Sequence, residues 1–165
     1  GIPGFTVKRV MGSFHKMVLP VGKDLHHDPA VPITVLGQDH VPALRNLYRE
    51  SYPENWFDAR MVATGTYRGV FEGDTLIAAA GTQVYSKSYR VAALGNIAVR
   101  PAHRNRGLGA ALTQALCRDL RPFADTIALN AGTENPAAVR CYEKIGFTIV
   151  DRFDWLLAGK DIPDE

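Results

Sequence analysis

Apolar and polar positions follow an irregular pattern at the start of the chain and a regular one from residue 33 onward. Short runs rich in β-branched and aromatic residues predict strands at 33–36, 66–71, 75–85, 90–99, 127–130 and 147–157. The run at 90–99 is apolar on both faces, which predicts a central strand. Glu72-Gly73-Asp74 lies between two of the runs and predicts a hairpin turn.

Helical spacing fills the gaps between these strands. Val41, Leu44, Leu47 and Tyr48 predict a helix that begins near Asp39. Residues 56–62 are rich in large apolar side chains and predict a second, short helix. An apolar stripe predicts a helix over 107–120, and a last helix begins after Asn135 and ends at a glycine, residue 146. The order β-α-α-β-β-β-α-β-α-β predicts an α/β fold around a mixed central sheet.

The first 30 residues have a different pattern. Residues 5–10 and 16–19 predict two short strands around Gly12, and the stretch 20–32 is typical of a linker. Adjacent His26 and His27 point to opposite faces in an extended chain, and no other ligand pattern completes a metal site, so we predict none. We expect residues 1–30 to be an N-terminal extension, or the tail of an upstream region, and residues 31–165 to form the main domain.

The length, net charge and cysteine content of the chain limit the classes of function that it can have. The chain has 165 residues, enough for one well-packed domain, and a net charge of +2. Such a weak charge argues against nucleic-acid binding and against a polybasic membrane anchor, and no apolar run reaches 18 residues. The two cysteines have no metal or disulfide spacing, which fits a cytoplasmic protein.

The residues between the strand at 90–99 and the helix at 107–120 carry the clearest chemistry. Arg104-x-x-Gly107-x-Gly109 joins a buried strand to a helix start. The first turn of a helix offers unpaired N–H groups and a positive dipole end, and glycine lets a ligand approach the backbone. These features predict a pyrophosphate site. The residues match neither the P-loop pattern nor the dinucleotide pattern GxGxxG.

The loop resembles the acyl-CoA pyrophosphate loop of the GNAT superfamily of acetyltransferases. Downstream, residues 135–147 resemble the second signature of that family, Asn-x-x-Ala-x-x-x-Tyr-x-x-x-Gly-Phe. The resemblance covers residues 33–157 and implies a GNAT-type domain over 31–165, with a sheet that is split at the acyl-CoA site. Residues 56–57, 64–69 and 93–97 are similar to the glycine N-acyltransferase-like branch.

The resemblance also implies roles for individual residues. The pantetheine arm of acetyl-CoA or coenzyme A is expected along the backbone of Ile97, Ala98 and Val99. The pyrophosphate is expected at Arg104, Asn105, Arg106, Gly107, Leu108, Gly109 and Ala110. Asn130 and Asn135 are expected to contact the cofactor arm. The acceptor pocket is expected to include Trp56, Phe57 and Tyr67, although large apolar residues at such spacing are more often core.

The implied reaction is the attack of a neutral amine on a thioester. Tyr142 is the expected catalytic acid, because a positioned phenol can protonate the leaving thiolate. The alternative is a packing role, with the hydroxyl of Tyr142 touching the sulfur without donating. Many relatives have a glutamate base near the central strand, where this chain has Asn96. Glu134, His103, Glu72 and a water chain stay open as the base.

These observations predict an enzyme that moves an acetyl or short acyl group from acetyl-CoA to a primary amine, by direct attack in a ternary complex. The acceptor is a small molecule or a peptide, and the protein is a monomer or a homodimer. A non-catalytic CoA-binding or sensing module is the alternative, because the central strand lacks a carboxylate.

Overall fold

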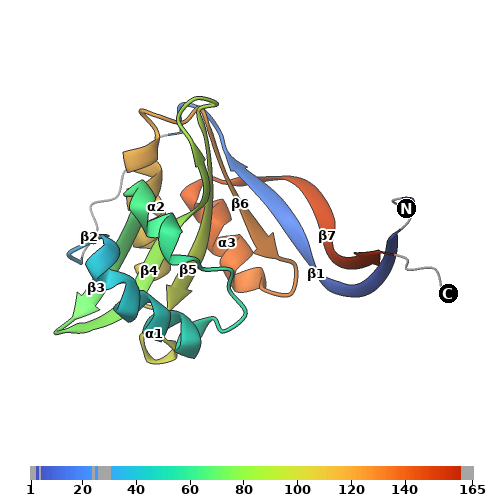
Figure 1. The fold of residues 1–165 in the computed structure, drawn as a ribbon. Coiled ribbons are helices and arrows are strands. Elements are labelled where there is room, and N and C mark those ends of the chain that lie inside the picture. Colours follow the sequence, from blue (N-terminus) through green and yellow to red (C-terminus); the bar gives the residue numbers. More distant parts are fainter. Residues whose placement is uncertain (1–2, 4, 24, 26–30, 161–165) are drawn as a thin grey trace.

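The chain folds into one mixed sheet with helices on both faces (Figure 1). The computed structural model describes residues 3, 5–23, 25 and 31–160. The strands are β1 (Phe5–Leu19), β2 (Thr34–Leu36), β3 (Tyr67–Glu72), β4 (Thr75–Ser86), β5 (Val91–Val99), β6 (Thr126–Gly132) and β7 (Thr148–Lys160). The α-helices are α1 (Val41–Ser51), α2 (Leu108–Leu120) and α3 (Pro136–Ile145), and the 3-10 helices are η1 (Gln38–His40), η2 (Ala59–Thr64) and η3 (Pro101–His103).

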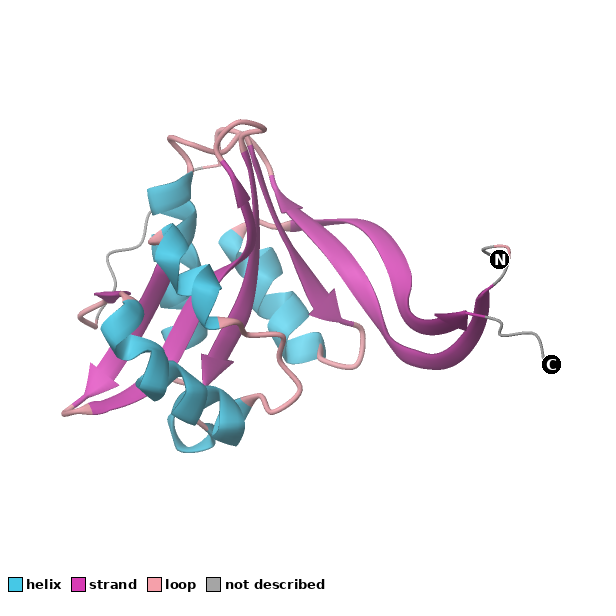
Figure 2. Ribbon diagram, viewed as in Figure 1, coloured by secondary structure: helices cyan, strands magenta, loops and turns pink. Residues whose placement is uncertain are grey.

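The strands form a single seven-stranded sheet in the order β2-β3-β4-β5-β6-β1-β7. All neighbours are antiparallel except β5 and β6, which are parallel and are connected through α2. This arrangement confirms the predicted α/β fold with a mixed central sheet. Because β5 and β6 are parallel, the helices that follow them, α2 and α3, begin at the same edge of the sheet (Figure 2).

Two apolar clusters lie on the two faces of the sheet. One contains the buried stripe of α2, with Leu112, Leu116 and Leu120, and the end of α3 at Ile145. The other contains α1 and η2 and has Tyr67 at its centre. Packing on both faces explains why β4 and β5 are apolar along most of their length.

The sheet is split between its two parallel strands. β5 pairs with β6 only from Val91 to Leu94, which lie opposite residues 126–129. Beyond Leu94, β5 pairs with β4 alone, and a bulge opposite Ala80 places Asn96 in the left-handed backbone region, with φ 53°. Figure 1 shows the two strands diverging from this point. The predicted split is therefore confirmed, and it leaves one edge of residues 95–99 without a partner among the described strands.

The prediction of two short N-terminal strands was wrong. Residues 5–19 form one continuous strand, which pairs with β7 from Phe5 to Val18 and with β6 from Phe14 to Leu19. Met17 and Leu19 are buried in the core. The described part of the expected N-terminal extension thus belongs to the main sheet. His26 and His27 lie outside the described residues.

The predicted helix at 56–62 is also corrected. Trp56 lies in a loop, and a 3-10 helix begins only after Asp58, whose carboxylate accepts a hydrogen bond from the Arg60 N–H at 2.8 Å. The shift follows from this cap, because the residue before the first helical turn is the one that satisfies its free N–H groups. None of the helices within the described ranges is long and apolar enough to cross a membrane.

Candidate functional site

The loop between β5 and α2 presents an uncapped helix start at the split. The chain leaves β5 at Val99, forms η3, and passes through left-handed conformations at Asn105 (φ 61°) and Gly107 (φ 75°) before α2 begins at Leu108. No side chain of the described residues caps the first turn of α2. Its N–H groups and positive dipole end are thus available to an anion.

Gly107 and Gly109 of the loop are glycines for different structural reasons. A Cβ at Gly107 would meet no atom within 4 Å, but the left-handed backbone there is strained for other residues. A Cβ at Gly109 would meet only Val99 Cγ2, at 3.7 Å, and its backbone is ordinary helix. The protein itself therefore has room for a side chain at Gly109. Open space above a helix start is what a bound diphosphate requires, and this arrangement fits the pyrophosphate of coenzyme A.

The cations of the loop are held by protein groups. The Arg104 guanidinium donates to the Val99 carbonyl and the Ser51 carbonyl, both at 3.3 Å, and so ties the loop to the end of α1. The His103 ring lies 3.0 Å from one oxygen of Glu72, and Arg106 lies 3.6 Å from the other. Arg104 and Arg106 thus shape the loop besides adding charge to it.

Two of the candidate bases pair with each other. The hydrogen bond from His103, followed by the nearby charges of His103 and Arg106, lowers the pKa of Glu72. A carboxyl with a lowered pKa is a weaker base, and its His103 partner is engaged at the same time. Glu72 and His103 are therefore poorly suited to take a proton from the acceptor amine. By contrast, Glu134 is exposed in the turn between β6 and α3.

Asn96 is fixed at the point where the sheet opens. Its side chain is 2% exposed, and its amide Nδ2 donates to the Tyr67 hydroxyl at 2.8 Å. The Tyr48 hydroxyl donates to the Asn96 carbonyl, also at 2.8 Å. Its Oδ1 is buried and has no hydrogen-bond partner among the described residues. Asn96 therefore supports the bulge that opens the split, and it offers no ionisable group there.

Tyr142 lies on α3 and faces the end of α1. Its ring packs edge-on against Phe147, with the centroids 6.1 Å apart, and the side chain is half-buried. Burial raises the pKa of Tyr142 well above its usual range, and the nearby Cys141 and Tyr52 raise it further. Among the described residues, no group accepts a hydrogen bond from its hydroxyl. The phenol is thus protonated and able to donate.

The two candidate asparagines lie along the same split. The Asn135 side chain caps α3 by accepting the Ala138 N–H at 3.1 Å, as predicted, which leaves its amide N–H groups for other partners. Asn130 is exposed on β6, one residue past Leu129, where the pairing with β5 ends. Asn130 thus lies on β6 just past its pairing with β5, and Asn135 lies between β6 and α3.

The three expected acceptor residues are not gathered into one pocket. Trp56 is 64% exposed and stacks on Trp155 of β7, with the ring centroids 5.5 Å apart. Phe57 packs between Tyr48 and Tyr67. Tyr67 has no exposed surface, so its predicted contact with the acceptor was wrong and it is a core residue. The contacts of Trp56 and Phe57 with an acceptor stay predictions.

Several site neighbours were missed by the sequence analysis. Tyr48 belongs to the buried stripe of α1 and Tyr52 is the residue directly after this helix. Trp155 lies in the middle of a long strand. Their aromatic character alone does not distinguish them from core residues. Tyr48 reaches Asn96 because α1 lies against β5, and Tyr52, directly after α1, lies near Tyr142 of α3.

Neither the two cysteines nor any group of metal-binding side chains in the described residues indicates thiol or metal chemistry. Cys117 is buried, which raises the pKa of its thiol to about 12, and burial also raises the pKa of Cys141. Both thiols are free and poorly ionised at neutral pH. Across the ranges that the structure describes, no group of three or more His, Cys, Asp or Glu side chains is arranged to hold a metal ion.

Comparison with known proteins agrees with this geometry. The sequence model of the Acetyltransferase (GNAT) family matches residues 36–147, which is more than half of the chain. The chain belongs to this family, whose members use acetyl-CoA. No curated protein sequence matches it.

Solved structures give the same result. A protein assigned to the GNAT family from Novosphingobium aromaticivorans superposes with a TM-score of 0.75 at 27% identity, over 97% of this chain and 69% of that one. The ribosomal-protein-S18-alanine N-acetyltransferase of Escherichia coli has a TM-score of 0.59 at 29% identity, over 71% of this chain and 77% of that one. A GNAT acetyltransferase from Colwellia psychrerythraea shares the fold, with a TM-score of 0.72 at 14% identity, over 92% of this chain. This chain spans 56% of that longer protein.

Proposed function

We propose that the protein transfers an acetyl or short acyl group from acetyl-CoA to a primary amine, by direct attack in a ternary complex. The observation that carries the proposal is the unpaired edge of β5, which leads through the loop to the uncapped start of α2. Tyr142 of α3 lies near Tyr52, at the end of α1. When bound at the edge of β5, acetyl-CoA supplies the thioester.

The backbone of β5 would hold the pantetheine arm. Residues 97–99 have one edge without a strand partner, and unpaired strand groups require hydrogen bonds that pantetheine amides supply. The N–H groups at 107–110 would bind the pyrophosphate, and the gap over Gly109 lets it approach. The amide N–H groups of Asn135, and the side chain of Asn130, would contact the arm between them.

Tyr142 would stabilise the leaving thiolate. A thiol has an ordinary pKa of about 8.5, below the raised pKa of Tyr142, so complete proton transfer from the phenol is uphill. Donation of a hydrogen bond needs no such transfer and still favours the departing charge. The hydroxyl would therefore act mainly as a hydrogen-bond donor to the sulfur.

The amine would need to lose its proton elsewhere. Asn96 stands at the opening of the split in place of a carboxylate, and Glu72 and His103 are paired with each other. We therefore favour an amine that binds already neutral, or that loses its proton through water or Glu134. The resemblance to the glycine N-acyltransferase-like branch is part of this proposal, as are the primary-amine acceptor and the cytoplasmic location that two free thiols favour.

Release of free thiol from acetyl-CoA tests this proposal. The purified chain is mixed with acetyl-CoA and a panel of acceptors that includes small amines, amino acids and peptides with free N-termini or lysines. We expect acceptor-dependent thiol release and an acetylated product by mass spectrometry. Binding of CoA without release for any acceptor would favour the non-catalytic CoA-binding module, which the absence of a carboxylate on β5 keeps as the second candidate.

A further inference from the structure

Strand β7 lies at one end of the sheet and forms a two-stranded ribbon with the first half of β1, which extends away from the other strands (Figure 1). Before Phe14, β1 pairs with β7 alone among the described strands. The outer edge of β7, which faces away from β1, likewise has no partner among them. A two-stranded ribbon is only marginally stable in water, so a further strand along this outer edge would stabilise it.

The outer edge of β7 is regular over most of its length. From Asp151 to Lys160, consecutive residues of β7 pair with β1, and the extra residues of the two bulges in this part, Lys8 and Met11, belong to β1. Edge strands are commonly protected by proline, lysine or a bulge, but β7 contains no proline and its one lysine is its last residue. Its apolar residues 155–157 are 44%, 47% and 54% exposed and alternate between the two faces. The outer edge is thus open to another strand.

The charged residues in the middle of β7 favour one such strand, a second copy of β7. Two copies related by a two-fold axis pair antiparallel, and residues directly opposite each other share a face. With the axis at Phe153, Arg152 of each copy lies opposite Asp154 of the other, and the two Phe153 rings are neighbours. Opposite charges and aromatic rings are favourable cross-strand pairs. An axis at Arg152 or at Asp154 would instead place like charges directly opposite each other, which is unfavourable.

Both charged groups are available for this pairing. Arg152 and Asp154 are exposed, and within the part of the chain that the structure describes neither forms an ion pair. Asp154 accepts a hydrogen bond from the Ser13 hydroxyl at 2.5 Å, and Arg152 lies opposite His15 of β1. A carboxylate accepts several hydrogen bonds, so Asp154 can keep Ser13 and also accept from Arg152 of the second copy.

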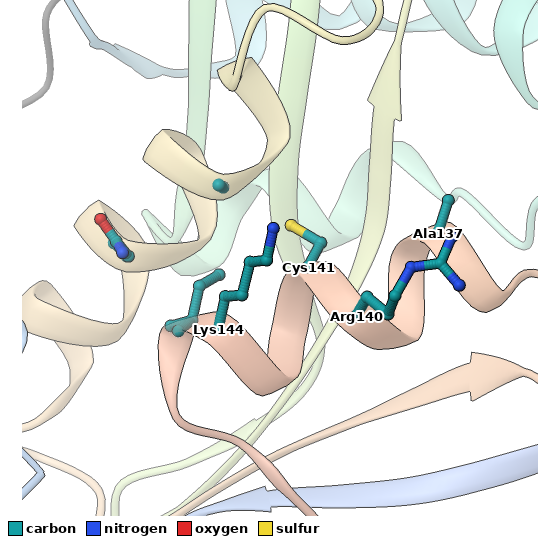
Figure 3. A pocket seen from close by; sticks show the side chains of 7 residues that line it. Ala137, Arg140, Cys141 and Lys144 are labelled. Carbon is teal, nitrogen blue, oxygen red and sulfur yellow. The ribbon is translucent and has the colours of Figure 1, made fainter.

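We propose that two copies of the chain associate through the outer edges of β7, with the two-fold axis at Phe153. The two ribbons then form one four-stranded antiparallel sheet in the order β1-β7-β7-β1. This association goes beyond the proposed function. None of the residues that line the groove between α2 and α3 belongs to the ribbon (Figure 3), and the test needs no acetyl-CoA.

Sedimentation equilibrium of the full chain over a range of concentrations tests the association. We expect a reversible equilibrium between monomer and dimer. Arg152→Asp and Asp154→Arg each replace two attractive pairs with two like-charged pairs, so each should raise the dimer dissociation constant about tenfold or more. The control Arg45→Glu makes the same change in net charge as Arg152→Asp, at an exposed position of α1 outside the ribbon, and should leave the constant unchanged. Circular dichroism verifies that each variant is folded.

An equimolar mixture of the two single variants tests the register itself. In a mixed dimer the two aspartates of one chain lie opposite the two arginines of the other, so association should return. An unaltered chain that stays monomeric at submillimolar concentration would overturn the proposal, as would a dimer that neither variant weakens or a mixture that does not associate. If Asp154→Arg does not fold because it loses the bond from Ser13, Arg152→Ala provides the comparison. It removes the attraction without adding repulsion and should weaken association less than Arg152→Asp does, and equal effects would contradict the register.

Discussion

Gly109 and Gly107 stand two residues apart and are glycines for different reasons. The backbone at Gly107 is left-handed, so the fold itself favours glycine there. At Gly109 the backbone is helical and the nearest atom to an added Cβ lies at 3.7 Å. The fold would accept alanine at this position, and the absence of a side chain is explained by the close approach of a ligand.

Gly109→Ala should therefore change stability and binding in opposite directions. An alanine that fits the native backbone raises the free energy of unfolding by about 0.4–1 kcal/mol. Its methyl group displaces the diphosphate from the helix start, and one lost hydrogen bond to a charged group costs about 1.5–3 kcal/mol, or roughly tenfold or more in affinity.

Denaturant unfolding and CoA titration of the same variant check this prediction. Gly37→Ala serves as the control, because a Cβ there meets nothing within 4 Å and Gly37 lies outside the loop. Unaltered CoA affinity in Gly109→Ala would show that the diphosphate does not approach this turn. By contrast, Gly107→Ala should lower the free energy of unfolding by about 1–2 kcal/mol.

Tyr142→Phe should lower kcat by about 10²-fold, the lower end of the range for loss of one hydrogen-bond donor to a developing negative charge. The ring and its contact with Phe147 remain, so the affinity for CoA should hardly change. The effect should shrink with a thioester whose thiol is more acidic, because that leaving group needs less stabilisation. An unchanged kcat would leave Tyr142 as a packing residue.

The raised pKa of Tyr142 also makes a prediction about pH. Below its pKa the phenol is protonated, so raising the pH to about 10, the usual pKa of tyrosine, should not remove the donor. A low-pH limb should instead follow the pKa of the acceptor amine, since only the neutral amine attacks. The kcat/KM profile with two amines of different pKa distinguishes these groups. A high-pH loss near neutrality that vanishes in Tyr142→Phe would contradict the assignment.

Strand β1 ties the end of the chain to its beginning. It lies between β6 and β7, and its buried Met17 and Leu19 belong to the α2 side of the core. Only β7 pairs with its first half, whereas both neighbours pair with its second half. The two halves should therefore tolerate deletion very differently.

Deletion of residues 1–19 should abolish cooperative unfolding and CoA binding, whereas deletion of residues 1–9 should preserve both. The longer deletion removes two buried side chains, each worth about 2–5 kcal/mol when truncated, against a typical total stability of 5–15 kcal/mol. Circular dichroism melting curves of the two truncated chains provide the comparison. A folded, CoA-binding chain without residues 1–19 would show that β6 and β7 close up without β1.

Local pattern explains which elements were predictable. The helix α2 repeats its apolar side chains at helical spacing, and α3 begins with an asparagine cap and a proline, so both could be predicted within a residue or two. Strand β1 could not, because its partners lie more than a hundred residues away and its exposed half lacks a clean alternation. The bulge at Asn96 was hidden for a similar reason, since it exists only relative to the register of β4.

The residues of the candidate site also divide into those that local motifs predict and those that depend on distant segments. The loop glycines and Tyr142 fall within contiguous motifs, and the motif spacing was enough to propose them as site residues. Tyr67 was misassigned because its neighbours come from separate elements. Its ring covers Gly81 of β4, where a Cβ would approach it to 2.4 Å, and its hydroxyl meets Asn96 of β5. No single segment of the sequence contains that arrangement.

The two helical layers pack on opposite faces of the sheet, and the sheet opens between β5 and β6 (Figure 2). A ligand in the split would contact both strands, the start of α2 and the start of α3 together. Such a ligand binds the folded chain and not the unfolded one, so it stabilises the fold by mass action. At a CoA concentration about one hundred times Kd this amounts to about 2.7 kcal/mol.

For a domain of this size we therefore expect CoA to raise Tm by about 5–10 °C. The increase should grow with CoA concentration and should fall in high salt, because the pyrophosphate contacts are partly electrostatic. Gly107→Val serves as the variant without a usable helix start. It should lose the CoA-dependent increase even where its own Tm is only modestly lower, since the branched side chain blocks the diphosphate. Thermal unfolding with increasing CoA measures both chains. An absence of any increase in the unaltered chain at millimolar CoA would show that the split does not bind the cofactor.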